Sequence, residues 1–126
     1  GAGAGTGKGH QAGARGILGL IYLDSTKEYD KAIEIFSKWS DTLKKYHPAG
    51  IYAAKRALIL IGQAYDGKKN YTKALQFTTQ GLSLALENNN RPEMMQAYLV
   101  LSSIYHHLGN NDSAYEYLVK YHIIKD

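Results

Sequence analysis

The stretch that decides the fold reads Lys-Glu-Tyr-Asp-Lys-Ala-Ile-Glu-Ile-Phe over residues 27–36. Its centre, Tyr29-Asp30-Lys31-Ala32, has a second copy in Tyr71-Thr72-Lys73-Ala74. A looser third copy, Gly109-Asn110-Asn111-Asp112-Ser113-Ala114, ends on the matching alanine. The alanines recur after 42 and 40 residues. Self-similarity at a fixed period of this size is typical of arrays in which one structural unit stacks on the next.

The segment before each copy repeats as well. It holds a large-small pair and, three residues after the small one, a tyrosine: Leu18-Gly19 with Tyr22, Ile61-Gly62 with Tyr65, and Leu101-Ser102 with Tyr105. Apolar residues follow at steps of three and four, which marks one face of a helix. No segment alternates with period two for long enough to indicate a strand. Each unit is therefore predicted to be two antiparallel helices, with the small residues allowing close approach.

Residues between the helices carry stop and start signals. Asn70 and Asn110 stand where an N-cap is wanted. Gly67 and Gly109 are predicted to take the left-handed backbone that ends a helix. Ser25-x-x-Glu28 reads as a capping box for the second helix. These signals predict six helices at roughly 11–24, 27–46, 49–66, 71–88, 92–108 and 111–125.

At these residues the chain resembles the tetratricopeptide repeat family, in a variant with a period of 40 to 43 residues rather than about 34. Two departures stand out: Arg15 lies where the family often has Trp, and Thr78 lies where Phe36 and Leu118 supply bulk. The resemblance implies an all-α, right-handed superhelical solenoid of three helix-turn-helix repeats, with six antiparallel helices. Another solenoid of helical pairs is the alternative fold.

The domain organisation follows from the same pattern and from the glycines. Seven of the 13 glycines fall in the first 16 residues. Residues 2–9, Ala-Gly-Ala-Gly-Thr-Gly-Lys-Gly, look like a phosphate-binding loop, but Gly9 follows Lys8 where a magnesium-binding hydroxyl is needed. We therefore interpret residues 1–9 as a tag, a linker or a disordered head. Residues 10–126 are predicted to form three repeats, at about 12–48, 49–90 and 91–126, with no cofactor.

Composition excludes several classes of protein. The chain has no cysteine, which excludes disulfide scaffolds, thiol nucleophiles and cysteine-based zinc sites. Residues 17–126 carry 13 basic and 11 acidic side chains, too balanced for a direct nucleic-acid interface. No apolar run approaches the 20 or so residues of a membrane span. A cytoplasmic and a periplasmic location are both compatible with the sequence.

The resemblance also implies where a partner would bind. In a stacked array the first helix of each repeat faces the concave side. By the resemblance and the helical spacing, that side is predicted to hold Leu20, Asp24, Arg56, Leu60, Gln63, Asp66, Gln96, Val100, Ser103 and His107. Such a mixed surface suits an extended peptide or a helix, whose backbone would meet the glutamines and whose carboxylate would meet the arginine. The alternative is an ordinary solvated face.

Enzyme and metal chemistry are not expected. His106 and His107 are adjacent, so a helix points them about 100° apart, which does not suit two ligands of one metal. No nucleophile with a neighbouring base is visible. Two functions remain. The favoured one is a non-catalytic scaffold that binds a protein or peptide.

The alternative function is a sensing or dimerisation segment of a bacterial two-component sensor kinase or transcriptional regulator. It rests on the run from Tyr115 to Asp126, which is similar to the end of repeat arrays in such proteins. Tyr117, Tyr121 and Ile124 would then have an uncovered side, through which the last helix could self-associate. The sequence that follows Asp126 in the full reading frame would separate the two functions.

Overall fold

The computed structural model describes residues 16–46 and 54–126. Within these ranges every regular element is a helix. Residues 16–20 are α-helical and run on into the π-helical turn η1 (Ile21–Ser25), and we call residues 16–25 the first helix. The later helices are α2 (Tyr29–Tyr46), α4 (Lys55–Gly67), α5 (Tyr71–Glu87), α6 (Arg91–His107) and α7 (Asn111–Lys125). The predicted all-α fold of six helices is confirmed.

Most predicted boundaries lie within two residues of those observed. The exception is α4, which begins at Lys55 after Ala54 in a turn, rather than at residue 49. The earlier start was predicted because the apolar spacing of α4 extends back along the sequence to Ile51. At the observed start, no side chain caps the helix at Ala54. The predicted helical segments 11–15 and 49–53, and the Gly-rich residues 1–9, lie outside the described residues.

The turns after α4, α5 and α6 share one design. Each has a residue of positive φ followed by an asparagine that caps the next helix. Gly109 has the predicted left-handed backbone, with φ +81°. Gly67 does not, because it is the last residue of α4 and the left-handed residue is Lys69, with φ 67°. The predicted caps Asn70 and Asn110 are confirmed: their side chains accept backbone N–H groups at 3.3 and 3.1 Å.

The turn between the first helix and α2 differs from this design. Tyr22 and Ala32 are ten residues apart, one more than in the other repeats, and η1 lies at this insertion. A π-helical turn is a common way for a helix to absorb one extra residue. Because η1 extends to Ser25 and α2 begins only at Tyr29, the predicted capping box of Ser25 and Glu28 is wrong.

Small residues set the distances between helices, as predicted. A methyl group added at Gly62 would lie 3.0 Å from the Thr78 nitrogen and 3.1 Å from the Ala74 carbonyl oxygen, so α4 and α5 touch along their backbones. Gly81, unexplained by the sequence alone, lies against α4, where an added methyl would meet Ile59 at 2.6 Å. Gly67 faces the ring of Tyr29, so its role is packing between the first two repeats.

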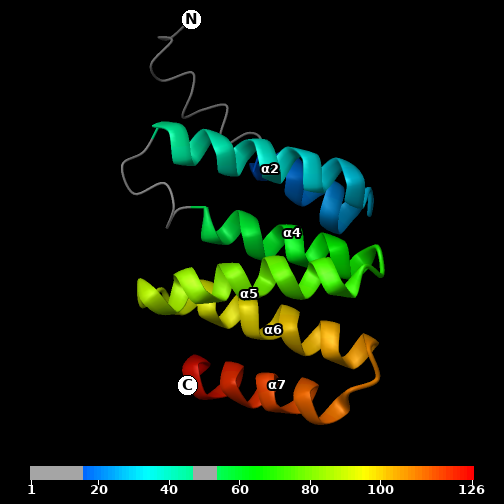
Figure 1. The fold of residues 1–126 in the computed structure, drawn as a ribbon, viewed down its shortest axis with the longest axis vertical. Coiled ribbons are helices and arrows are strands. Elements are labelled where there is room, and N and C mark those ends of the chain that lie inside the picture. The colour runs from blue at the N-terminus through cyan, green and yellow to red at the C-terminus, as the bar shows by residue number, and fades with distance from the viewer. Residues whose placement is uncertain (1–15, 47–53) are drawn as a thin grey trace, which may run out of the picture.

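The helices form a single stack, coloured from blue to red along the chain in Figure 1. α2 lies near one end and α7 at the other, and each helix contacts its neighbours along the chain. α6 also contacts α4, which brings the first helices of the second and third repeats together on one side. Two apolar clusters join the repeats, one around Phe36 and Leu60 and one around Ile59 and Ile104. This side of the stack carries the candidate site.

Candidate functional site

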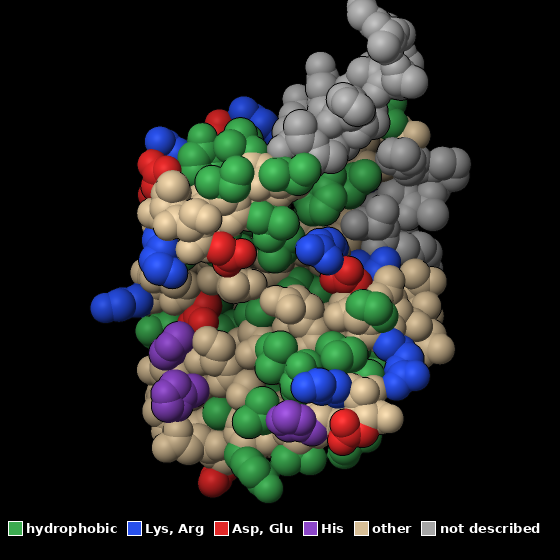
Figure 2. Space-filling view, turned by 180° about the vertical axis from the view of Figure 1, so that it is seen from behind, with side chains coloured by type: hydrophobic (Ala, Val, Ile, Leu, Met, Phe, Trp, Pro, Cys, Tyr) green, Lys and Arg blue, Asp and Glu red, His purple; other side chains and the backbone are tan. Residues whose placement is uncertain are grey.

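Two adjoining hollows form a groove across the first helix, α4 and α6. The larger has a volume of about 370 Å³ and is lined by Leu20, Asp24, Arg56, Leu60, Gln63, Pro92, Glu93 and Gln96. The smaller has a volume of about 250 Å³ and is lined by Gln63, Asp66, Gln96, Leu99, Val100 and Ser103. They share the two glutamines, and we call both together the concave groove. Figure 2 shows the side of the molecule opposite to that in Figure 1, with charged and apolar side chains mixed across it.

The structure brings the predicted concave-face residues together. Nine of the ten line one or the other hollow, and the tenth, His107, contacts Asp66 at the end of the smaller one. Leu60 and Val100 are buried and form an apolar floor, whereas Asp24 and Arg56 are exposed at the rim. The groove therefore has an apolar base with polar groups above it, which is the general build of a recognition site.

Three lining residues were missed: Pro92, Glu93 and Leu99. All three lie on α6 within four residues of Gln96, which was predicted. Residues three and four apart share a helical face, so the spacing that selected Gln96 also points to them. The sequence therefore contained the signal for these positions.

The rim of the groove carries more negative than positive charge. Arg56 lies 3.8 Å from Glu93, with the arginine side chain 53% exposed and the glutamate 12% exposed. Asp24 is exposed and forms no ion pair among the described residues that surround it. At 3.8 Å the pair between Arg56 and Glu93 is loose, and an exposed guanidinium in such a pair keeps donors free for a second carboxylate.

A pair of glutamines bridges α4 and α6 in the middle of the groove. Gln96 Nε2 donates to Gln63 Oε1 at 3.3 Å. Each amide retains further donors and acceptors, since a glutamine side chain can form up to four hydrogen bonds. Both side chains are half-buried, so they present these groups toward the groove from a fixed position.

The far end of the groove is organised around Asp66. Its side chain is 8% exposed, and its two oxygens have separate partners. Ser103 Oγ donates to Oδ2 at 2.8 Å, and His107 Nδ1 lies 2.8 Å from Oδ1. Ser103 and His107 belong to α6 and Asp66 to α4, so the carboxylate joins the second repeat to the third.

The residue types Ser, His and Asp occur together here, but not in the order that catalysis needs. A serine nucleophile is activated by a histidine that accepts its proton, with the aspartate behind the histidine. Here Ser103 donates to the aspartate instead, so the carboxylate lies between the two other residues. The arrangement holds two repeats together and does not activate the hydroxyl.

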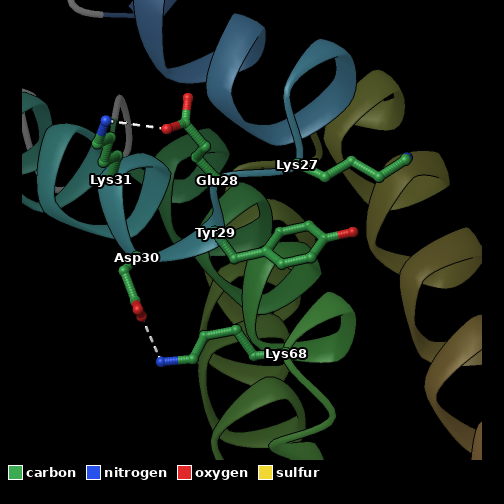
Figure 3. Close-up of a pocket in the computed structure, with 6 residues that line it drawn as sticks. All are labelled: Lys27, Glu28, Tyr29, Asp30, Lys31 and Lys68. Carbon is green, nitrogen blue, oxygen red and sulfur yellow. Dashed lines mark hydrogen bonds and ion pairs between the residues drawn. The ribbon is translucent and has the colours of Figure 1, made fainter.

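A separate hollow lies between the start of α2 and the end of α4, lined by Lys27, Glu28, Tyr29, Asp30, Lys31 and Lys68 (Figure 3). Lys31 Nζ is 2.9 Å from Glu28 Oε1, and Lys68 pairs with Asp30. The hydrogen bond from Lys31 lowers the pKa of Glu28, and the bond to Glu28 raises the pKa of Lys31. The bond to Asp30 likewise raises the pKa of Lys68. Both acidic groups therefore already have lysine partners, and the pair between Lys68 and Asp30 joins the second repeat to the first.

Two further properties bear on function. Among residues 16–46 and 54–126, no group of three or more His, Asp or Glu side chains is placed to hold a metal ion. In the same part of the chain, no helix combines the length and the apolar character that crossing a membrane requires.

Comparison with protein families gives the identity of the repeat. The model of the tetratricopeptide repeat matches residues 55–92, which span α4 and α5, and residues 95–121, which span most of α6 and α7. The chain belongs to the tetratricopeptide repeat family. Repeats of this family are generally scaffolds for protein interaction and are typically non-enzymatic. A search of curated proteins finds no match to this tetratricopeptide repeat chain.

Proposed function

We propose that this tetratricopeptide repeat domain is a non-catalytic scaffold that binds an extended peptide or a helix of a protein partner in the concave groove. The observation that carries the proposal is the pair of adjoining hollows, which together extend over three helices from three different repeats. A surface built from several repeats suits a long ligand, since each repeat can contact a different part of it.

Three kinds of group in the groove contact different parts of the partner. Half-buried Leu20 and Leu99, which is 36% exposed, offer accessible apolar surface for the side chains of the partner, above the buried Leu60 and Val100. Gln63 and Gln96 offer amide groups that can pair with a peptide backbone. Arg56 offers a half-exposed guanidinium for a carboxylate, held near its place by Glu93.

The experiment that tests the proposal begins with a displayed library of random peptides selected on the wild-type domain. The affinity of an enriched peptide is then measured by calorimetry against wild type and against Arg56→Glu. We expect the reversal of charge to weaken binding by about tenfold or more, because it replaces the donor with a repelling carboxylate. Circular dichroism should show the same helical content in both proteins, since the side chain is 53% exposed.

A matched control separates the groove from the rest of the surface. Lys38→Glu also reverses one charge, but Lys38 lies on α2 outside the groove, in an exposed pair with Glu34. We expect the control to bind the peptide with the affinity of wild type. Equal affinity of wild type and Arg56→Glu, or the failure of any peptide to be enriched, would refute the assignment of the groove.

A further inference from the structure

The first helix exposes apolar residues at positions that later repeats bury. Ile17, Leu18 and Ile21 are 64%, 38% and 44% exposed, and we call them the head strip. When the three repeats are aligned on Tyr22, Tyr65 and Tyr105, the residues at the same positions are Leu60, Ile61 and Ala64 on α4 and Val100, Leu101 and Ile104 on α6. None of these six is more than 5% exposed.

The last helix shows the same contrast at the other end of the stack. Tyr115 is 70% exposed, Leu118 is 37% exposed and His122 is exposed, and we call these three residues of α7 the tail strip. The sequence predicted Tyr117, Tyr121 and Ile124 as the uncovered residues, but these are half-buried, and Tyr117 stacks on Tyr98 and Tyr105 of α6. The positions that match the tail strip are Leu75, Thr78 and Leu82 on α5 and Ile33, Phe36 and Ser40 on α2. These are buried or half-buried. Single exposed apolar residues are ordinary, but two strips that are covered in every other repeat are not.

The internal junction between repeats two and three shows what these strips do when they are covered. Leu75 and Leu82 of α5 pack against the cluster that contains Val100 and Ile104 of α6. The tail positions of one repeat therefore cover the head positions of the next. The two ends of the stack expose the two halves of this same interface.

We propose that the tail strip of one copy of this chain docks on the head strip of a second copy, in the arrangement by which α5 packs on α6. The first helix and α7, which carry the two strips, lie toward opposite ends of the stack (Figure 1). Each molecule therefore keeps one uncovered strip after the first contact. Such a head-to-tail contact generates assemblies that lengthen with concentration, unless the rotation between copies closes a ring. Neither strip lines the concave groove, so peptide binding and self-association use different surfaces.

The test uses three proteins and sedimentation velocity at concentrations up to about 1 mM, where even a weak contact is populated. The head-blocked variant carries Ile17→Lys and Ile21→Lys, and the tail-blocked variant carries Tyr115→Lys and His122→Lys. All four side chains are exposed, so the variants should fold, which circular dichroism checks. We expect the average mass of wild type to rise past that of a dimer, and each variant alone to remain a monomer.

Mixing the two variants gives the decisive result. The head-blocked protein keeps a working tail and the tail-blocked protein keeps a working head, so an equimolar mixture should form dimers and nothing larger. The control is Ile123→Lys, which removes an α7 side chain that is also 70% exposed but matches Ser83, a residue exposed on α5; it should associate like wild type. A wild-type monomer at every concentration, or a dimer that the head-blocked variant retains alone, would overturn the proposal.

Discussion

The first two repeats solve the same packing problem in different ways. At Gly19 the nearest neighbours of an added methyl would all be ring atoms of Phe36, at 2.5 to 2.9 Å. At the matching Gly62 they include backbone atoms of α5, because the residue that matches Phe36 is Thr78. The ring of Phe36 therefore fills the contact between the two helices of the first repeat. In the second repeat, the backbones of α4 and α5 meet directly. The same position of the repeat thus holds a large residue in one copy, where its ring forms the contact, and a small one in the other, where backbone atoms form it.

The largest effect is expected for Gly62→Leu. The new side chain would have to occupy the space of the α5 backbone, which cannot move aside as a flexible side chain does. We expect loss of the folded domain, seen as loss of cooperative thermal unfolding in circular dichroism. The control is Gly16→Ala, where the added methyl lies 3.5 Å from Trp39 in ordinary contact, and its melting temperature should stay close to that of wild type. An unchanged melting temperature in Gly62→Leu would remove the close-packing argument.

A smaller but still large effect is expected for Phe36→Ala. Phe36 is fully buried between the first helix and α4, so its truncation should lower the free energy of unfolding by about 3–5 kcal/mol. Leu118 occupies the matching position on α7 but is 37% exposed, so Leu118→Ala should cost less than about 2 kcal/mol. Denaturant unfolding of both variants measures the two values. Equal losses in the free energy of unfolding would mean that burial does not distinguish Phe36 in the first repeat from Leu118 in the third.

The smallest effect is expected for Thr78→Val, and it has the opposite sign. Thr78 is fully buried, and its hydroxyl oxygen has no hydrogen-bond partner among the residues that the structure describes. Replacing an unpaired buried hydroxyl by a methyl group of similar shape should raise the free energy of unfolding by about 1 kcal/mol. The neighbouring Thr79→Val is the control, because Thr79 is exposed and its change should stay within about 0.5 kcal/mol. If Thr78→Val destabilised the domain instead, the hydroxyl would have to form a bond in solution.

The sequence predicted the features that repeat and missed those that break the repeat. Helix positions and the caps at Asn70 and Asn110 follow from local sequence signals, and the face that holds Arg56 and Gln96 follows from the family resemblance together with helical spacing. The π-helical turn η1 does not, because a single extra residue can be absorbed in a helix or in a turn. The packing role of Gly67 depends on Tyr29, 38 residues earlier in the chain, and no local rule connects them.

In the candidate site, too, the sequence predicted which residues share a face but not which residues bond to each other. The family resemblance and the spacing along each helix found nine residues that line the groove, but they could not pair groups on different helices. Asp66 was predicted as part of a face open to a partner, yet it is 8% exposed and bonded to Ser103 and His107 of the next repeat. The two glutamines likewise bond to each other. Such pairs depend on how two repeats are stacked, and that is fixed only in the folded chain.

The central claim is that partners bind the concave groove, and an NMR titration of the ¹⁵N-labelled domain with a selected peptide tests it most directly. If partners bind there, the largest shifts should fall on the backbone and side-chain amides of groove residues on α4 and α6, above all Gln63, Gln96 and Ser103. The outward side of α5, represented by exposed Thr79 and Ser83, should change little. Shifts confined to α5 or α7, with the groove amides unmoved, would contradict the account.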